Sequence, residues 1–263
     1  MGKLLGQAFR YLKWRAGAKS IYGIHSTFVY NLAERLRRKK VSSRCRRYDE
    51  YVKHLKKSKT VIETVDFGAG AQNGAYKTVM TEVGKLVRKR THGFRQLHLL
   101  FRISDYFKPK TILEFGTAAG VSAVYLKKPV PNARMITMEG CASLANRAEK
   151  TFKDLHLHNV EIEVGNFDVI LPDVLKGFET IDLIYFDGNH RKEPTLQYFE
   201  QCLPYAGEES VFIFDDIYWS DGMSAAWETI KNDPRVTLTV DLFWFGLVFF
   251  KKNRVKQNIR LKL

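Results

Sequence analysis

Acidic residues recur between residues 111 and 263, each at the point where an apolar run ends. They are Glu114, Glu139, Asp187, Asp215 and Asp216. Carboxylates in such places accept hydrogen bonds from hydroxyl groups, hold hard cations or take up protons. Two or three of them packed together repel each other unless a proton or a cation intervenes. We therefore take the ends of these runs as the candidate site.

A glycine-rich segment follows the first of these acids. It reads Glu114-Phe-Gly116-Thr117-Ala-Ala-Gly120-Val-Ser122. A turn of this kind between a strand and a helix lets a ligand approach the backbone closely. Its spacing is E-x-G-x-x-x-G rather than the G-x-G-x-x-G that seats a pyrophosphate, which argues against NAD and FAD.

Two of the acids suit particular parts of a ligand. Glu114, beside the glycine-rich turn, suits a cationic group such as an α-amino group. Glu139 ends the next strand, 19 residues after Gly120. An acid at that place accepts hydrogen bonds from ribose hydroxyls.

These acids belong to an alternating pattern of strands and helices. Strands are expected over 110–116, 133–140, 160–164, 181–187 and 210–216, with a helix after each, and two more over 236–242 and 244–252. Such alternation produces a parallel sheet with helices on both faces. No helix separates the last two strands, so one of them must run antiparallel. We expect an α/β, Rossmann-like, seven-stranded and mostly parallel sheet, with its ligand crevice at the carboxyl ends of the strands.

The front of the chain is strongly basic. Residues 1–110 carry 26 Lys and Arg against 7 Asp and Glu, whereas residues 111–263 carry 17 against 21. We therefore expect a basic, mostly helical section over 1–94, which caps the substrate or binds a partner, and a ligand-binding domain over 95–263. A basic run attracts nucleic acid or an acidic surface, although a solvated helix face is the commoner explanation.

Two further segments of the front section leave alternatives open. Basic and apolar residues interleave near the start, which suits a membrane-surface helix, although packing on the other domain is the commoner explanation. They are Lys3, Leu4, Leu5, Phe9, Arg10, Leu12, Lys13 and Arg15. The segment Asp66-Phe67-Gly68-Ala69-Gly70 also resembles a cofactor loop, but no acid-ended strand follows about 20 residues later. We interpret it as a loop that covers the site.

The glycine-rich turn, Glu139-Gly140 and the strand order together resemble class I S-adenosylmethionine-dependent methyltransferases. Within that class the sequence is similar to the catechol and caffeoyl-CoA O-methyltransferases and to related bacterial proteins. The resemblance covers roughly residues 95–263. It implies a cofactor site for S-adenosylmethionine formed by Glu114, Gly116, Thr117, Gly120, Ser122, Glu139, Gly140, Cys141, Asn166, Phe167 and Asp187. In this site the glycine-rich turn lines the methionine part, Glu139 holds the ribose, and Asn166 and Phe167 border the adenine.

The same resemblance implies a second set of roles. In the metal-dependent members an acid after the fourth strand and a pair after the fifth hold a divalent cation, and a base lies three residues after the first acid. Asp187, Asp215 and Asp216 match the metal ligands for Mg²⁺ or Ca²⁺, and His190 matches the base. The sequence departs from the pattern at two of these positions, because the usual base is Lys and the usual last ligand is Asn. Helix capping by Asp215 and Asp216 is the alternative.

These features predict a transferase that moves a methyl group from S-adenosylmethionine to an oxygen of a small molecule, with His190 and Asp187 as catalytic residues. Two alternatives stay open: an RNA methyltransferase that uses the basic section, and an adaptor that binds the cofactor without catalysis. Three scattered cysteines and the lack of a signal or transmembrane pattern favour a reducing, cytoplasmic location. The methyl acceptor and the oligomeric state, including a homodimer, stay open.

Overall fold

The computed structural model describes residues 2–37, 43–65, 78–252 and 255–263. The chain divides into two compact units. The terminal unit comprises Met1–Arg37 and Phe178–Leu263, and the middle unit comprises Arg38–Gly177. The segment Asp66–Gly70, expected to be a covering loop, lies outside the described residues. The boundary predicted between residues 94 and 95 stays a prediction.

The middle unit contains the first three strands of the main sheet and the helices around them. Its elements are α3 (Ser43–Leu55), β1 (Val61–Val65), β2 (Thr78–Glu82), α4 (Val83–Arg90), α5 (Phe94–Phe107), β3 (Thr111–Phe115), α6 (Val121–Lys127), β4 (Arg134–Glu139), α7 (Ala142–Asp154), β5 (Val160–Val164) and α8 (Phe167–Lys176). Strands β3, β4 and β5 run parallel. Strands β1 and β2 form a separate antiparallel pair.

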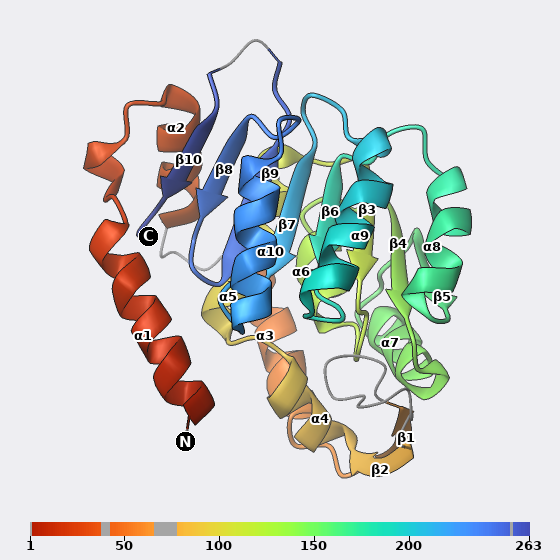
Figure 1. The fold of residues 1–263 in the computed structure, drawn as a ribbon. Helices are drawn as coiled ribbons and strands as arrows, with labels where there is room; N and C mark the ends of the chain where they lie inside the picture. The colour runs from red at the N-terminus through yellow and green to blue at the C-terminus, as the bar shows by residue number, and fades with distance from the viewer. Residues whose placement is uncertain (1, 38–42, 66–77, 253–254) are drawn as a thin grey trace. The chain divides into compact units, whose positions relative to one another are not determined.

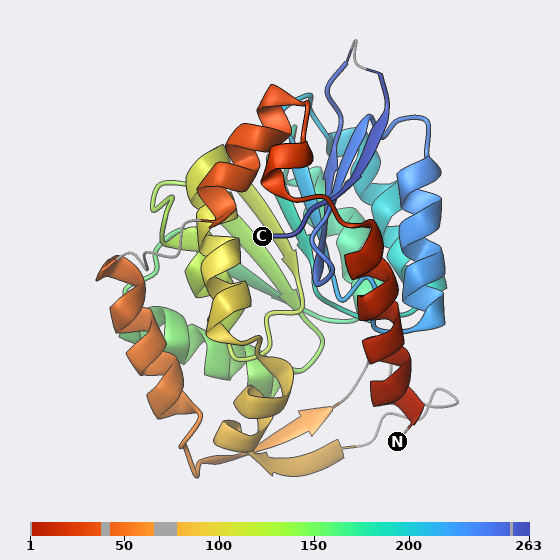
Figure 2. The ribbon, with the colours of Figure 1, turned by 90° about the vertical axis from the view of Figure 1, so that its left-hand side faces the viewer.

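The terminal unit combines both ends of the chain. Its elements are α1 (Gly2–Gly17), η1 (Ile21–Gly23), α2 (Thr27–Arg37), β6 (Leu183–Phe186), α9 (Lys192–Cys202), η2 (Leu203–Tyr205), β7 (Val211–Asp215), α10 (Asp221–Asn232), β8 (Leu238–Asp241), β9 (Phe245–Phe249) and β10 (Gln257–Arg260). Helices α9 and α10 cover one face of its strands and α2 lies on the other (Figures 1 and 2). The ring of Phe28 in α2 meets that of Phe249 in β9 at 5.3 Å.

The main sheet has eight strands rather than the expected seven, in the order β10-β8-β9-β7-β6-β3-β4-β5. Strand β9 is antiparallel to both β7 and β8, as predicted for the last pair. The additional strand β10 pairs parallel with β8. Its sequence, QNIR, is mostly polar and half exposed, so it carries none of the apolar pattern by which the other strands are recognised. The α/β class and the mostly parallel sheet are confirmed.

The central strands read as continuous apolar runs because both of their faces are covered. Every residue of β6, β7 and β9 is buried. Burial on both faces removes the apolar-polar alternation of a half-exposed strand. Within the described part of the chain, no helix is long and apolar enough to cross a membrane.

Helix α3 is fastened to the middle unit by a buried polar contact. The Nε2 atom of His98 in α5 lies 2.9 Å from Oδ1 of Asp49, and the hydroxyl of Tyr125 in α6 donates to the same oxygen at 2.6 Å. Tyr125 is fully buried, and a buried hydroxyl without an acceptor is costly. Asp49 therefore holds one helix of the basic front section against two helices of the middle unit.

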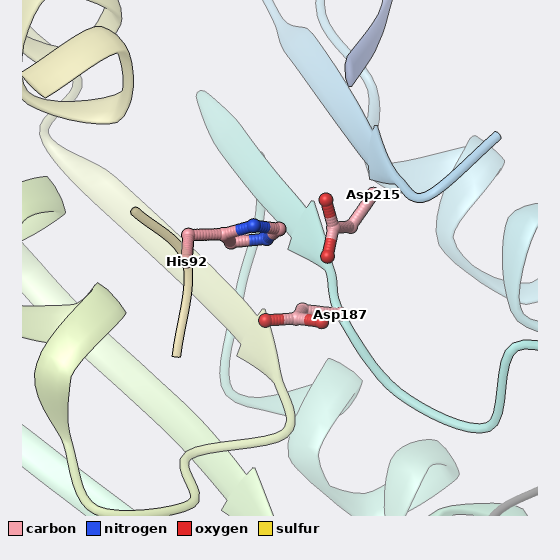
Figure 3. Close-up of side chains that lie close together, drawn as sticks. All are labelled: His92, Asp187 and Asp215. Atoms are coloured by element: carbon pink, nitrogen blue, oxygen red, sulfur yellow. The ribbon is translucent and has the colours of Figure 1, made fainter. Parts of the chain in front are cut away.

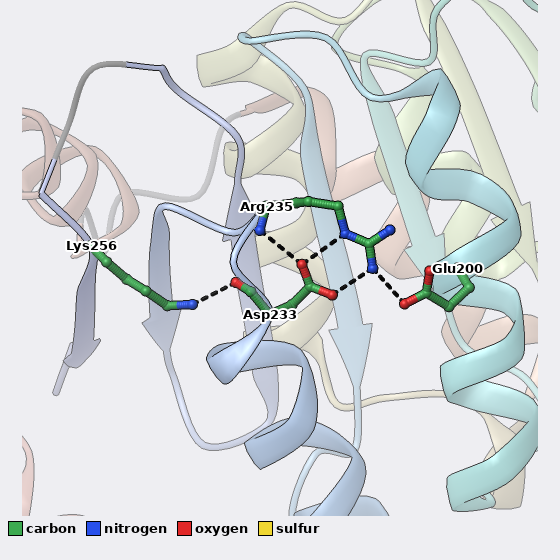
Figure 4. A network of polar contacts seen from close by, with 4 residues as sticks. All are labelled: Glu200, Asp233, Arg235 and Lys256. Carbon is green, nitrogen blue, oxygen red and sulfur yellow. Dashed lines mark hydrogen bonds and ion pairs between the residues drawn. The ribbon is translucent and has the colours of Figure 1, made fainter.

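An ion network orders the chain where α10 ends (Figure 4). The backbone N–H and Nε of Arg235 donate to Asp233 Oδ1 at 2.8 and 2.9 Å, and Nη2 reaches Glu200 Oε1 at 2.5 Å. The Lys256 ammonium group donates to the Asp233 carbonyl at 2.5 Å. The hydrogen bonds from Arg235 hold the pKa of Asp233 below its usual value. This contact therefore stabilises the fold above the carboxyl's ordinary pKa and is lost as the pH falls through the lowered one.

Gly246 in β9 generates a stability prediction. A Cβ at this position would lie 2.6 Å from two ring atoms of Trp227, a rigid side chain that is 1% exposed. Overpacking of this kind costs about 1–3 kcal/mol, so Gly246→Ala should lower the free energy of unfolding by about that amount in a denaturant titration. Gly222→Ala is the matched control, because its Cβ would have no neighbour closer than 3.7 Å. Equal stability of the two variants would contradict this packing.

Candidate functional site

The glycine-rich turn of the middle unit connects β3 to α6 through three left-handed residues. They are Gly116 (φ 91°), Ala118 (φ 47°) and Gly120 (φ 78°). A Cβ on Gly120 would lie 2.7 Å from Cε1 of Phe152, so both the backbone angle and the space require glycine here. The N–H groups of Gly116 and Thr117 donate to the Met138 carbonyl at 3.0 and 3.1 Å. The turn is therefore anchored on the end of β4.

Glu139 connects this turn to the start of α7. Its Oε2 accepts from the Ala118 N–H at 2.8 Å and its Oε1 accepts from the Cys141 N–H at 2.9 Å. The residue is 8% exposed. Burial raises the pKa of Glu139, and the hydrogen bonds from the Cys141 and Ala118 backbone oppose that rise. A carboxylate offers about four lone-pair directions, so Glu139 retains capacity for a ligand hydroxyl.

Glu114 lies beside the turn, near the end of β3. Its side chain is fully buried, and its Oε2 accepts from the Thr137 hydroxyl at 2.6 Å. The Thr137 and Thr117 hydroxyl oxygens are 2.7 Å apart. The acid is thus enclosed and reaches the turn through two threonines, and its expected contact with a cationic ligand group stays a prediction. Sequence reasoning missed Thr137, whose signal is a polar residue inside the apolar strand β4.

The remaining cofactor candidates surround the ends of β4 and β5. Gly165 N–H donates to the Glu139 carbonyl at 2.9 Å, which joins these two strand ends. Asn166 caps α8 by accepting from Asp168 N–H at 3.1 Å, and the Phe167 ring meets Phe115 edge-on at 5.8 Å. Gly140 and Cys141 lie between β4 and α7, and Ser122 lies in the first turn of α6. The structure thus brings the turn, Glu139 and the segment 165–167 together at one edge of the three strands.

The terminal unit gathers the other predicted residues at the ends of β6 and β7. His190 Nε2 lies 3.4 Å from Asp187 Oδ1. His190, Asp215 and Asp216 each offer one ligand atom, and these atoms lie within 4.8 Å of one another. Figure 3 shows the Asp187 and Asp215 carboxylates at the ends of their strands, and it also draws His92, which sequence reasoning does not single out. Asp216 (φ 49°) and Asn189 (φ 61°) both adopt left-handed backbones.

The protonation of His190 follows from this surplus of acids. Burial disfavours its charged form, but the hydrogen bond to Asp187 and the charges of Asp187, Asp215 and Asp216 outweigh that effect and raise the pKa of His190 to about 9. At neutral pH the imidazole is therefore protonated, and its charge partly balances the three carboxylates. His190 must therefore lose this proton before it can act as a base.

We call Asp187, Asp215 and Asp216 the acid cluster. Its carboxylate oxygens are of the ligand type that binds hard divalent cations such as Mg²⁺ and Ca²⁺. The same three carboxylates raise the pKa of His190. The group of the terminal unit whose ligand atoms converge is His190, Asp215 and Asp216, so the predicted ligand set of Asp187, Asp215 and Asp216 stays a prediction. Capping of a helix by Asp215 or Asp216 is not observed, because Ser220 accepts from Met223 N–H at the start of α10.

The charge balance of the acid cluster leads to a titration prediction. In the presence of a chelator, the His190 imidazole should titrate near pH 9 by NMR, and Asp187→Asn should lower the midpoint because it removes a hydrogen-bonded charge. Since the folded-state pKa lies above the ordinary value of about 6.5, the stabilisation by this pair is complete below that value and disappears as the pH rises through about 9. An unshifted titration in both proteins would contradict the cluster.

Comparisons with known proteins identify a related domain and a related protein. Residues 113–217 match the family model of a methyltransferase domain. A catechol O-methyltransferase from Niastella koreensis is 32% identical over 118 residues, which is 44% of this chain and 52% of that protein. The chain thus matches about half the length of this relative.

Solved structures of methyltransferases share the fold. The O-methyltransferase TomG from Streptomyces achromogenes, in complex with SAM, is 23% identical with a TM-score of 0.54, covering 62% of this chain and 82% of that one. An O-methyltransferase from Bacillus cereus, in complex with SAH, is 22% identical with a TM-score of 0.53, covering 61% and 83%. The Podospora anserina methyltransferase PaMTH1 is 14% identical with a TM-score of 0.58, covering 87% and 97%. Residues 113–217 therefore match a methyltransferase domain, and the chain resembles the class I methyltransferases of the catechol and caffeoyl-CoA O-methyltransferase group, as its motifs predict.

Proposed function

We propose that this protein is an S-adenosylmethionine-dependent methyltransferase that methylates an oxygen of a small molecule. The observation that carries the proposal is Glu139, an acid at the end of β4 whose carboxylate is oriented by the N–H groups of Ala118 and Cys141. An acid held there, beside a left-handed glycine turn, suits a ribose. The family-model match and the cofactors named for the TomG and Bacillus cereus structures support it.

The proposed roles divide the cofactor among the strand ends of the middle unit. Gly116, Thr117, Gly120 and Ser122 line the methionine part. The two glycines, which have no side chain, let a ligand approach the backbone closely. Glu139, Gly140 and Cys141 surround the ribose. Asn166 and Phe167 border the adenine, for which an aromatic ring provides a flat apolar contact.

The reaction is a direct displacement. The acceptor oxygen forms a bond to the methyl carbon while the carbon–sulfur bond breaks. The electron pair of the broken bond stays on the sulfur. The acceptor proton goes to His190, whose Nε2 lies 3.4 Å from Asp187 Oδ1 in an ion pair that orients the ring. Asp187, Asp215 and Asp216 would hold Mg²⁺ or Ca²⁺, and such a cation lowers the pKa of a bound hydroxyl. Neutralisation of these carboxylates would also bring the pKa of His190 down from about 9 toward the range of a base.

Two other functions are weighed against this proposal. An RNA methyltransferase would use the basic front section, but the residues after β6 read Asp187-Gly-Asn189-His190 rather than the N-P-P-Y-type tetrad that many enzymes methylating nucleic acid amines carry. An adaptor that binds cofactor without catalysis would need no base. The ion pair of His190 and Asp187 favours the enzyme.

Cofactor binding tests the role of Glu139. Loss of a charged hydrogen-bonding partner costs about 1.5–3 kcal/mol, so Glu139→Gln should weaken S-adenosylhomocysteine binding by about 10–150-fold in a calorimetric titration. Glu163→Gln, an exposed acid on the neighbouring strand β5, is the matched control, and thermal melts of both variants check the fold. Unchanged affinity of Glu139→Gln would remove the residue from the site. Tighter binding of NAD than of S-adenosylhomocysteine would refute the cofactor proposal.

Turnover tests the acceptor side separately. With a catechol as trial acceptor and Mg²⁺ present, His190→Gln should lower kcat by about 10²–10⁴-fold, the usual contribution of a general base, while cofactor affinity stays unchanged. His158→Gln, at an exposed histidine, should have no effect. A chelator should abolish turnover and Mg²⁺ should restore it. Activity that survives chelation but falls with His190→Gln would refute the metal alone, and full activity of His190→Gln would refute the base.

A further inference from the structure

One side of helix α1 is used within the terminal unit. Trp14 is 5% exposed, and its ring lies 5.5 Å from that of Phe243. Tyr11 meets the same Phe243 ring edge-on at 4.9 Å. Arg10 donates to the Tyr218 carbonyl at 3.1 Å. These contacts determine which side of the helix faces the unit.

The opposite side of α1 presents apolar side chains to solvent. Phe9 is 70% exposed and Leu12 is 63% exposed, and Ala8 and Ala16 are exposed with them. With 3.6 residues per turn, these four positions form one stripe on the side away from Trp14. We call these four residues the outer stripe. Helix α1 lies at the edge of the terminal unit in Figure 1 and in front of it in Figure 2.

The charges around the outer stripe favour an anionic surface over a second copy of this chain as its partner. Lys13 and Arg15, on its two borders, are both exposed, and residues 2–17 contain no Asp or Glu. A second copy packed stripe to stripe would place these cations near their own equivalents, and like charges brought together at an interface are costly. An anionic lipid surface instead attracts each of them. An apolar stripe bordered by Lys and Arg is the composition of helices that lie in the plane of a membrane interface.

We propose that α1 attaches this protein to anionic membrane surfaces. Phe9 and Leu12 enter the boundary between headgroups and acyl chains, and Lys13 and Arg15 contact lipid phosphates. The helix has 16 residues and lies on the membrane without crossing it. This inference does not depend on the proposed methyltransferase activity.

Vesicle co-sedimentation of the full chain tests the apolar part of the proposal. The protein should bind vesicles of phosphatidylcholine mixed with phosphatidylglycerol and should bind phosphatidylcholine alone weakly. Phe9→Ser/Leu12→Ser should bind the mixed vesicles at least about tenfold more weakly, because its buried apolar area is lost. Val169→Ser is the matched control, since Val169 is 71% exposed on α8 and should be neutral. Circular dichroism should show that all variants are folded.

A second pair of variants tests the charges. Lys13→Gln/Arg15→Gln should weaken binding by about fivefold for each charge removed near the surface. Lys150→Gln/Lys153→Gln removes the same charge from exposed positions on α7 and should have a smaller effect. Equal vesicle binding by wild type and Phe9→Ser/Leu12→Ser would overturn the proposal. So would a dimer, seen by light scattering without lipid, that this double variant converts to a monomer.

Discussion

The hydrogen bonds between the Glu139 carboxylate and the backbone of Ala118 and Cys141 hold the cofactor half of the candidate site together. Ala118 belongs to the turn after β3 and Cys141 precedes α7, so one buried acid connects two segments that are far apart in the sequence. The Glu139 carbonyl also accepts from Gly165, which adds the end of β5. A residue that orders these segments by its own hydrogen bonds is already oriented for a ligand. Such preorganisation reduces the entropy lost on binding.

The acid cluster of the terminal unit presents the opposite electrostatic situation. Asp187, Asp215 and Asp216 concentrate negative charge around one imidazole, and without a cation they keep it protonated. Lysine, the base that the family resemblance implies, ordinarily has a pKa near 10.4, whereas histidine has one near 6.5. Once the carboxylates are neutralised, histidine therefore needs a smaller shift to act as a base at neutral pH. The departure from the family pattern is compatible with the same chemistry.

The sequence predicted the elements whose burial leaves a pattern and missed those that are polar. Strands β6, β7 and β9 were recognisable because both faces are buried, whereas QNIR in β10 gives no such signal. The convergence of Asp187, His190 and Asp215 followed from the parallel order of β6 and β7. The enclosure of Glu114 could not be predicted from the strand order, because the position of its side chain depends on the hydroxyls of Thr137 and Thr117. A spacing rule specifies where an acid lies along a strand, but the packing around it decides whether it reaches a ligand.

A crystal structure of the protein with S-adenosylhomocysteine tests the central claim most directly. We expect the ribose hydroxyls to lie within hydrogen-bonding distance of the Glu139 carboxylate, while that carboxylate keeps its bonds to the Ala118 and Cys141 backbone. We also expect the thioether part of the ligand to lie against the turn from Gly116 to Gly120. A ligand bound elsewhere in the chain, or a ribose held without Glu139, would contradict the account.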